Sequence, residues 1–120
     1  MKSFALTLIC LLTAGTALAQ DCTAPAEPKI PDGSSADMQQ MLDGQQAVKA
    51  FQAANSEYMD CLDPKIAEAT EKVTAEDASE ADLSTLKSLE EAYNAAVSRE
   101  ENVAEEFNSE IRDYKEANPG

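Results

Sequence analysis

Apolar side chains recur at every third or fourth position over two long stretches of the chain, and a short run of helix-capping residues separates the two stretches. The first stretch follows Met38, Met41, Leu42, Val48, Phe51, Asn55, Tyr58, Leu62, Ile66, Ala69 and Val73. The second follows Leu83, Leu86, Glu90, Tyr93, Val97, Glu100, Ala104, Phe107, Ile111 and Tyr114. This spacing places an apolar stripe along each of two helices. The sequence therefore predicts an all-α fold, a long antiparallel helical hairpin that is coiled-coil-like.

The first helix is predicted at residues 36–73. A Ser-x-x-Asp pattern at 34–37 opens it near Ala36 as a capping box. Pro64 interrupts the apolar stripe, because proline lacks a backbone N–H and crowds the preceding turn. With Asp63 before it, Pro64 is also a suitable first residue for a fresh helix. Since the apolar register runs on past Pro64, we expect a kinked or briefly broken helix that keeps its direction.

Two successive capping boxes, at 74–77 and 79–82, mark the turn between the helices. Each begins with Thr or Ser and has Asp three positions later. The second helix is predicted at 75–117, and the Asn-Pro-Gly sequence of the C-terminal tail at 118–120 ends it.

An antiparallel hairpin pairs residues whose numbers add up to a constant, and a value of about 148 fits this sequence. That register places Phe51 opposite Val97, and Asn55 opposite Asn94 to within one residue. A buried pair of asparagines would fix the register at some cost in stability. Two solvated amides at the edge of the seam are the alternative.

Two acidic residues, Glu90 and Glu100, fall on the apolar stripe of the second helix. A carboxylate is unfavourable in a buried seam unless it is paired. These positions indicate either an imperfect stripe or a broader one, in which Leu89 and Val103 share the burial.

An extended Pro-rich N-terminal strap, residues 20–35, precedes the hairpin. Prolines at every third position over 25–31 favour polyproline geometry and exclude a helix interior. The 14 residues from Cys22 to Ala36 span about 43 Å in that geometry. The 25 residues from Ala36 to Cys61 span about 37 Å of helix. A strap that folds back along the first helix therefore brings Cys22 close to Cys61.

Residues 1–19 are predicted to be a bacterial signal peptide of the Sec type. Lys2 precedes an apolar run at 4–12, and an Ala-x-Ala pattern predicts cleavage between Ala19 and Gln20. The run is too short to span about 30 Å of hydrocarbon. An uncleaved anchor and a buried core helix are the alternatives. We therefore expect a periplasmic or secreted protein without stable membrane insertion after cleavage.

Cleavage at that position would remove Cys10 and leave Cys22 and Cys61 as a pair in an oxidising compartment. We predict a disulfide between them; two free thiols or an intermolecular bridge are the alternatives. Two cysteines without histidine make a poor zinc site. Their wide separation also differs from the Cys-x-x-Cys spacing of a redox pair.

Charge and composition exclude several functions. The chain has nine Lys and Arg against 23 Asp and Glu, a formal charge of −14, so it lacks the basic footprint that nucleic acid requires. It has no histidine, the commonest general base and metal ligand. A serine nucleophile would therefore lack its usual base. We predict no enzymatic activity, no catalytic residue, no cofactor and no dedicated metal site.

A possible acidic interaction face on the second helix comprises Glu90, Glu91, Glu101, Glu105 and Glu106. Such a face would attract a basic partner and steer its approach. It would also hold divalent cations weakly, because calcium favours clustered carboxylate oxygens, although no EF-hand pattern is present in the sequence. The third interpretation is that the charge only keeps an exported helical protein soluble.

Two motifs carry a resemblance that covers nearly the whole chain after residue 19: Cys-x-x-Pro-x-x-Pro-x-Ile-Pro-Asp-Gly from Cys22, and Tyr-x-x-Cys-Leu from Tyr58. The chain resembles small exported helical proteins of proteobacteria to which no function is assigned. The resemblance implies a periplasmic or secreted helical protein with a disulfide. We expect a non-enzymatic acidic protein that acts by binding or by its structure in the cell envelope, with an envelope protein or itself as partner. Weak divalent-cation buffering is the alternative, and an enzyme is a further one.

Overall fold

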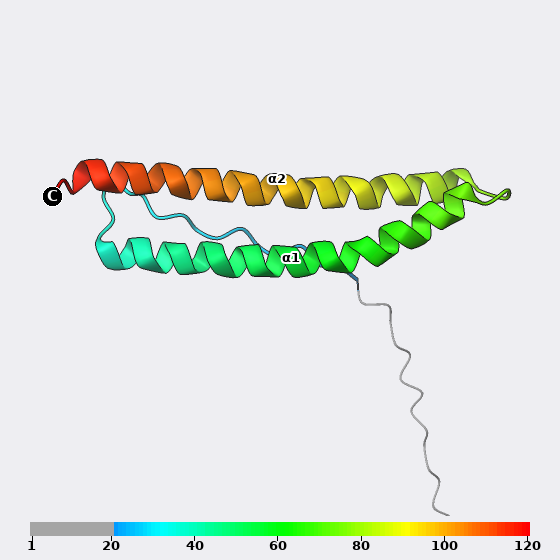
Figure 1. Cartoon of the computed structure of the whole chain (residues 1–120), viewed down its shortest axis with the longest axis horizontal. Helices are drawn as coiled ribbons and strands as arrows, with labels where there is room; N and C mark the ends of the chain where they lie inside the picture. Colours follow the sequence, from blue (N-terminus) through cyan, green and yellow to red (C-terminus); the bar gives the residue numbers. More distant parts are fainter. Residues whose placement is uncertain (1–20) are drawn as a thin grey trace, which may run out of the picture.

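The computed structural model describes residues 21–120, which form two long helices packed against each other (Figure 1). Helix α1 spans Met38–Thr74, and helix α2 spans Glu80–Ala117. The helices run antiparallel, and the described part of the strap, residues 21–35, runs back along the seam between them (Figure 1). The predicted all-α helical hairpin with an extended N-terminal strap is confirmed.

The predicted signal peptide, residues 1–19, lies outside the described residues. The same holds for Cys10 and for the expected cleavage site between Ala19 and Gln20. These assignments remain sequence predictions.

Helix α1 is capped by Asp37 and not by the predicted box at 34–37. The Asp37 carboxylate accepts the Gln40 N–H at 2.8 Å, and the Gln40 side chain accepts the Asp37 N–H at 2.8 Å. This reciprocal box satisfies N–H groups that the first turn leaves unpaired. Ser34 instead donates its N–H to the Asp32 carboxylate at 3.0 Å, within the turn of the strap. The helix therefore begins at Met38, two residues later than predicted.

Pro64 lies inside α1, and the helix continues through it to Thr74. Because proline has no N–H, it leaves the carbonyl of Asp60 without its intrahelical partner, a common cause of kinks. Figure 1 shows α1 bending toward α2 over its last turns. Of the two expected forms, a kinked helix and a briefly broken one, the structure has the kinked helix.

Helix α2 begins at the second of the two predicted capping boxes. The Asp82 N–H donates to the Ser79 hydroxyl at 3.2 Å, and the Ser79 N–H donates to the Asp82 carboxylate at 2.9 Å. At the first predicted box, the Thr74 hydroxyl donates back to the carbonyl of Glu71 at 2.9 Å, so Thr74 ends α1 and does not start α2. The second helix therefore starts at Glu80 and not at 75.

The main core lies in the half of the hairpin where α1 begins and α2 ends. Its buried members are Met41, Val48, Phe51, Val103 and Phe107, with Ile30, Ala36, Ile111 and Tyr114 packed against them. Val103 is 3% exposed and Leu89 is half-buried, whereas Glu90 is exposed. The broader apolar stripe is therefore the correct alternative for α2.

The register of the two helices differs from the predicted one. Asn55 contacts Ala96, and Gly44 faces Phe107, so the numbers of each pair add up to 151 and not to about 148. Asn94 is exposed, and the predicted Asn55–Asn94 pair does not form. The small side chain of Ala96 explains the shift, because it lets Asn55 approach the backbone of α2. Val97, the predicted partner of Phe51, is 37% exposed.

Candidate interaction surface

The strap covers one of the two long grooves between the helices. Pro25, Pro28 and Pro31 are all half-buried, as expected for an extended chain that turns every third residue toward its support. A Cβ atom on Gly44 would lie 2.7 Å from the ring of Pro31, so only glycine lets the strap lie this close to α1. Ile30 reaches the main core. The strap is therefore the third layer of this half of the molecule.

Each end of the strap is fastened to a different helix. Cys22 forms a disulfide with Cys61 of α1, with the two Cα atoms 5.7 Å apart, as predicted. At the other end the buried Gly33 donates its N–H to the Glu110 carboxylate of α2 at 2.7 Å. A Cβ atom on Gly33 would overlap the backbone carbonyl of Glu110. The strap thus links both helices and fixes their separation.

A polar contact lies in the middle of the seam. Asn55 is fully buried and donates to the Ala96 carbonyl at 3.0 Å and to the Glu100 carboxylate at 3.1 Å. This bond explains how Glu100 is accommodated on the apolar stripe. The Asn55 side-chain oxygen and the Arg99 Nε are buried without a hydrogen-bond partner. The contact therefore favours one register at an energetic cost.

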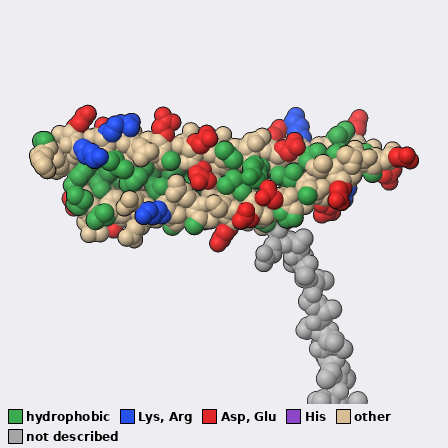
Figure 2. Space-filling view, viewed as in Figure 1, with side chains coloured by type: hydrophobic (Ala, Val, Ile, Leu, Met, Phe, Trp, Pro, Cys, Tyr) green, Lys and Arg blue, Asp and Glu red, His purple; other side chains and the backbone are tan. Residues whose placement is uncertain are grey.

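Among residues 21–120, no segment covers the opposite side of the seam, and two hollows lie along it. The first has a volume of about 510 Å³ and is lined by Met38, Met41, Leu42, Gln45, Phe107, Ile111, Tyr114, Lys115, Asn118 and Gly120. Met38 is 57% exposed and Leu42 is 45% exposed. In Figure 2, apolar side chains gather between the helices toward this end of the molecule. Contiguous exposed apolar side chains of this kind mark interaction sites.

The second hollow has a volume of about 330 Å³ and is lined by Gln52, Val97, Glu100, Glu101 and Ala104. On α2, Val97, Ala104 and Ile111 are seven residues apart, so they share one side of the helix and join the two hollows. On α1, Met38, Gln45 and Gln52 show the same spacing. We call the surface formed by these six residues the uncovered face.

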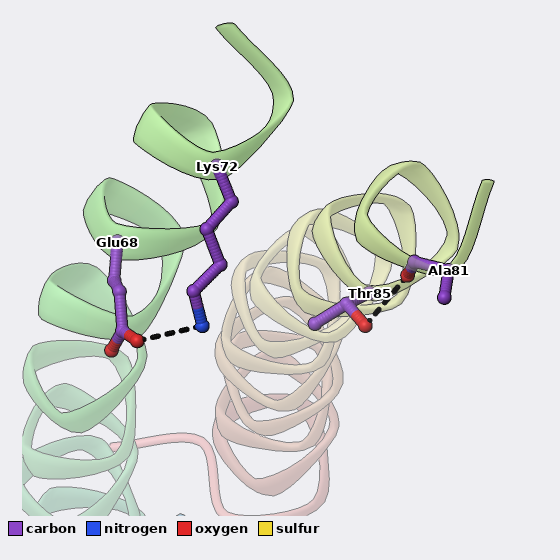
Figure 3. A network of polar contacts seen from close by, with 4 residues as sticks. All are labelled: Glu68, Lys72, Ala81 and Thr85. Atoms are coloured by element: carbon purple, nitrogen blue, oxygen red, sulfur yellow. Dashed lines mark hydrogen bonds and ion pairs between the residues drawn. The ribbon is translucent and has the colours of Figure 1, made fainter. Parts of the chain in front are cut away.

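A third cleft, of about 250 Å³, lies between the helices near the loop that joins them and is lined by Lys65, Glu68, Ala69, Lys72, Asp82, Thr85 and Leu89. The Lys72 ammonium contacts the Glu68 carboxylate at 2.8 Å (Figure 3). The hydrogen bond and the charge of Lys72 lower the pKa of Glu68, and the same contact raises the pKa of Lys72. Thr85 donates to the Ala81 carbonyl at 2.9 Å. The Lys72–Glu68 pair and the Thr85 hydroxyl are thus each engaged within their own helix.

The five glutamates of the predicted acidic interaction face are all exposed on α2, and Glu91 pairs weakly with Lys87 at 3.9 Å. They do not converge on one point: within residues 21–120, no group of three or more His, Cys, Asp or Glu side chains is placed to hold a metal ion. Glu101 is the one member that also lines a hollow of the uncovered face. The acidic face is therefore a dispersed set of charges.

Within the described part of the chain, neither helix has a stretch long and apolar enough to cross a membrane. Comparisons with protein-family models, with curated proteins and with solved structures find no match to this chain.

The sequence prediction did not identify the uncovered face. Its signal was present in the seven-residue spacing of Met38, Gln45 and Gln52 beside the main stripe. The contact between Gly33 and Glu110 was also not predicted, because backbone proximity leaves little trace in side-chain periodicity.

Proposed function

We propose that this protein is a non-enzymatic binding protein, exported to the bacterial periplasm or the medium, that holds a protein partner on its uncovered face. One observation carries the proposal. The strap buries one groove of the hairpin, whereas the other leaves Met38 and Leu42 exposed over a hollow of about 510 Å³. Large apolar side chains beside a groove are unfavourable in water and favour association.

The disulfide and the predicted signal peptide support export, since structural disulfides persist in oxidising compartments. The formal charge of −14 favours solubility at high concentration. It also favours partners that carry positive charge. The exposed glutamates have no surroundings that would adapt them to acid–base chemistry. Binding accounts for the exposed apolar side chains; cation buffering does not.

Site-specific photocrosslinking in the exporting cells tests this function. A photoreactive amino acid at Leu42, which lines the first hollow beside the uncovered face, is compared with one at Glu57, which borders the strap near the disulfide. We expect a discrete protein adduct from position 42 and none from position 57. Equal labelling at both positions, or no protein adduct at position 42, would rule out the uncovered face as the binding surface.

A further inference from the structure

We infer that the partner on the uncovered face is a second copy of this chain, which packs antiparallel to the first so that four helices form a bundle. The inference rests on the proposed function, because it names the occupant of the same surface. It is carried by opposite charges on α2 and by exposed apolar side chains on α1 that one two-fold axis brings to complementary positions. A two-fold contact requires that every position on one copy meets its counterpart at an equal distance across the axis.

The match on α2 is one of opposite charges. Lys115 is the one charged side chain, among those of residues 21–120, that lines the first hollow. Glu101 lines the second hollow. The two lie fourteen residues apart, about 21 Å along the helix. A two-fold axis halfway between them, near Asn108, brings Lys115 of each copy to Glu101 of the other.

The match on α1 concerns shape. Met38 and Leu42 are exposed, and both line the first hollow. In the observed register, in which paired numbers add up to 151, Asn108 lies opposite residue 43 of α1. The same axis therefore brings Met38 of each copy level with residue 48 of the other, beside Ala104 at one edge of the second hollow, and places Leu42 near its own counterpart. Because the operation is symmetric, each copy supplies one apolar projection and one hollow.

The second hollow has room for such side chains. Its volume is about 330 Å³, and its lining includes the small Ala104 and the partly exposed Val97. Methionine is flexible enough to fill an irregular hollow of this kind. Heptad-spaced rows on both helices are also the arrangement in which side chains of facing helices interlock.

The high net charge opposes association but does not prevent it. The full chain carries a formal charge of −14, and the repulsion between two copies is screened beyond about 8 Å at physiological salt. Glu106 follows Ala104 by two positions, about 200° around the helix, so it lies away from the contact. Where the copies touch, the pairing of Lys115 with Glu101 makes the local electrostatic interaction attractive.

Charge reversal tests the pairing on the oxidised chain without its signal peptide, at 150 mM NaCl. Sedimentation equilibrium from about 1 μM to 1 mM measures the dimer dissociation constant. We expect a concentration-dependent dimer that Lys115→Glu or Glu101→Lys weakens by roughly tenfold or more, because each reversal acts twice in a symmetric interface. The double variant restores the opposite charges, and we expect its dissociation constant to return to within a few-fold of the original.

Matched controls separate this pairing from a change in overall charge. Lys87→Glu changes the net charge as Lys115→Glu does, and Glu106→Lys changes it as Glu101→Lys does, but both lie outside the contact. Each control is expected to leave the dimer nearly unchanged. Circular dichroism confirms that every variant remains helical.

Three outcomes would overturn the inference: a monomer over the whole concentration range, equal effects of the controls, or no rescue in the double variant. A Leu42 crosslink to a different protein would also overturn it while leaving the proposed binding function intact. A crosslink at twice the mass of the chain supports both.

Discussion

The backbone N–H of Gly33 donates to the carboxylate of Glu110 at 2.7 Å. This bond joins the strap to the last turns of α2 across 77 residues of sequence. Gly33 lies so close to the Glu110 carbonyl that any side chain would displace it. The strap therefore holds α2 directly, in addition to its disulfide with α1.

Replacing Gly33 by alanine should detach this end of the strap. A methyl group would overlap the Glu110 carbonyl, and overpacking of this kind costs about 1–3 kcal/mol. Urea unfolding followed by circular dichroism measures the loss. Gly120→Ala is the control for steric overlap, because nothing lies within 4 Å of that position; its φ of 143° adds backbone strain only at the last residue of the chain. Equal stability of the two variants would contradict the close contact.

Replacing Gly44 by alanine should destabilise the protein although alanine is the better helix former. Helix propensity alone predicts a gain of about 1 kcal/mol. The new Cβ atom, however, would lie 2.7 Å from the Pro31 ring and 3.3 Å from Phe107. We expect the double variant Gly44→Ala/Pro31→Ala to recover part of the loss, which a double-mutant cycle from urea unfolding measures. Additive effects would show that Pro31 is not the obstacle.

Removing the disulfide with Cys22→Ser/Cys61→Ser should lower the free energy of unfolding by about 4 kcal/mol, the chain-entropy value for a separation of 39 residues. Reduction of the unmodified protein should have nearly the same effect. Both are measured by urea unfolding with and without reductant. A stability that is insensitive to reductant would contradict an intramolecular bridge.

The start of α2 should weaken in acid. The backbone N–H and the hydroxyl of Ser79 hold the pKa of Asp82 below its ordinary value of 3.8. Because the folded-state pKa is the lower one, the contribution of Asp82 is present above pH 3.8 and is lost as the pH falls through the folded value. The protection factor of the Ser79 amide against hydrogen exchange, followed as a function of pH, measures this change. In Asp82→Asn this protection factor should no longer depend on pH in this range. A profile equal to that of the unmodified protein would contradict the cap.

Calcium and magnesium should not bind at a saturable site. The glutamates of α2 are dispersed, and within residues 21–120 no group of acidic side chains is placed as a metal site. Calorimetry with each ion at about 1 mM is expected to give only heats of dilution. A saturable heat that Glu101→Gln/Glu105→Gln abolishes would favour the cation-buffering alternative.

The parts of the fold that could be predicted follow from fixed dimensions. The disulfide between Cys22 and Cys61 was expected because polyproline and helical rises leave little freedom in where the strap ends. A kinked or briefly broken helix that keeps its direction past Pro64 was expected because the apolar register does not change there, and the structure shows that the helix is not broken. Such features depend on many residues at once, so local errors average out.

The parts that could not be predicted depend on single close contacts. The register was shifted by three because large apolar residues were paired, whereas Ala96 and Gly44 allow the closest approach. The cap of α1 moved to Asp37 because Asp32 engages Ser34 in a separate turn. The uncovered face was not identified because periodicity reports that a side chain is apolar, and not which side of the seam the strap occupies.

The strap reaches only as far along α1 as Cys61, where its disulfide lies. The two halves of the hairpin should therefore differ in local stability. All five members of the main core belong to the fastened half, whereas beyond Cys61 α1 has only Leu62 and Ala69 fully buried, and the tip bends at Pro64. Thermal breathing should therefore begin at the loop joining the helices and travel inward, with amides on either side of residues 75–79 exchanging first. The end of the hairpin that carries the loop should therefore open before the end that the strap holds.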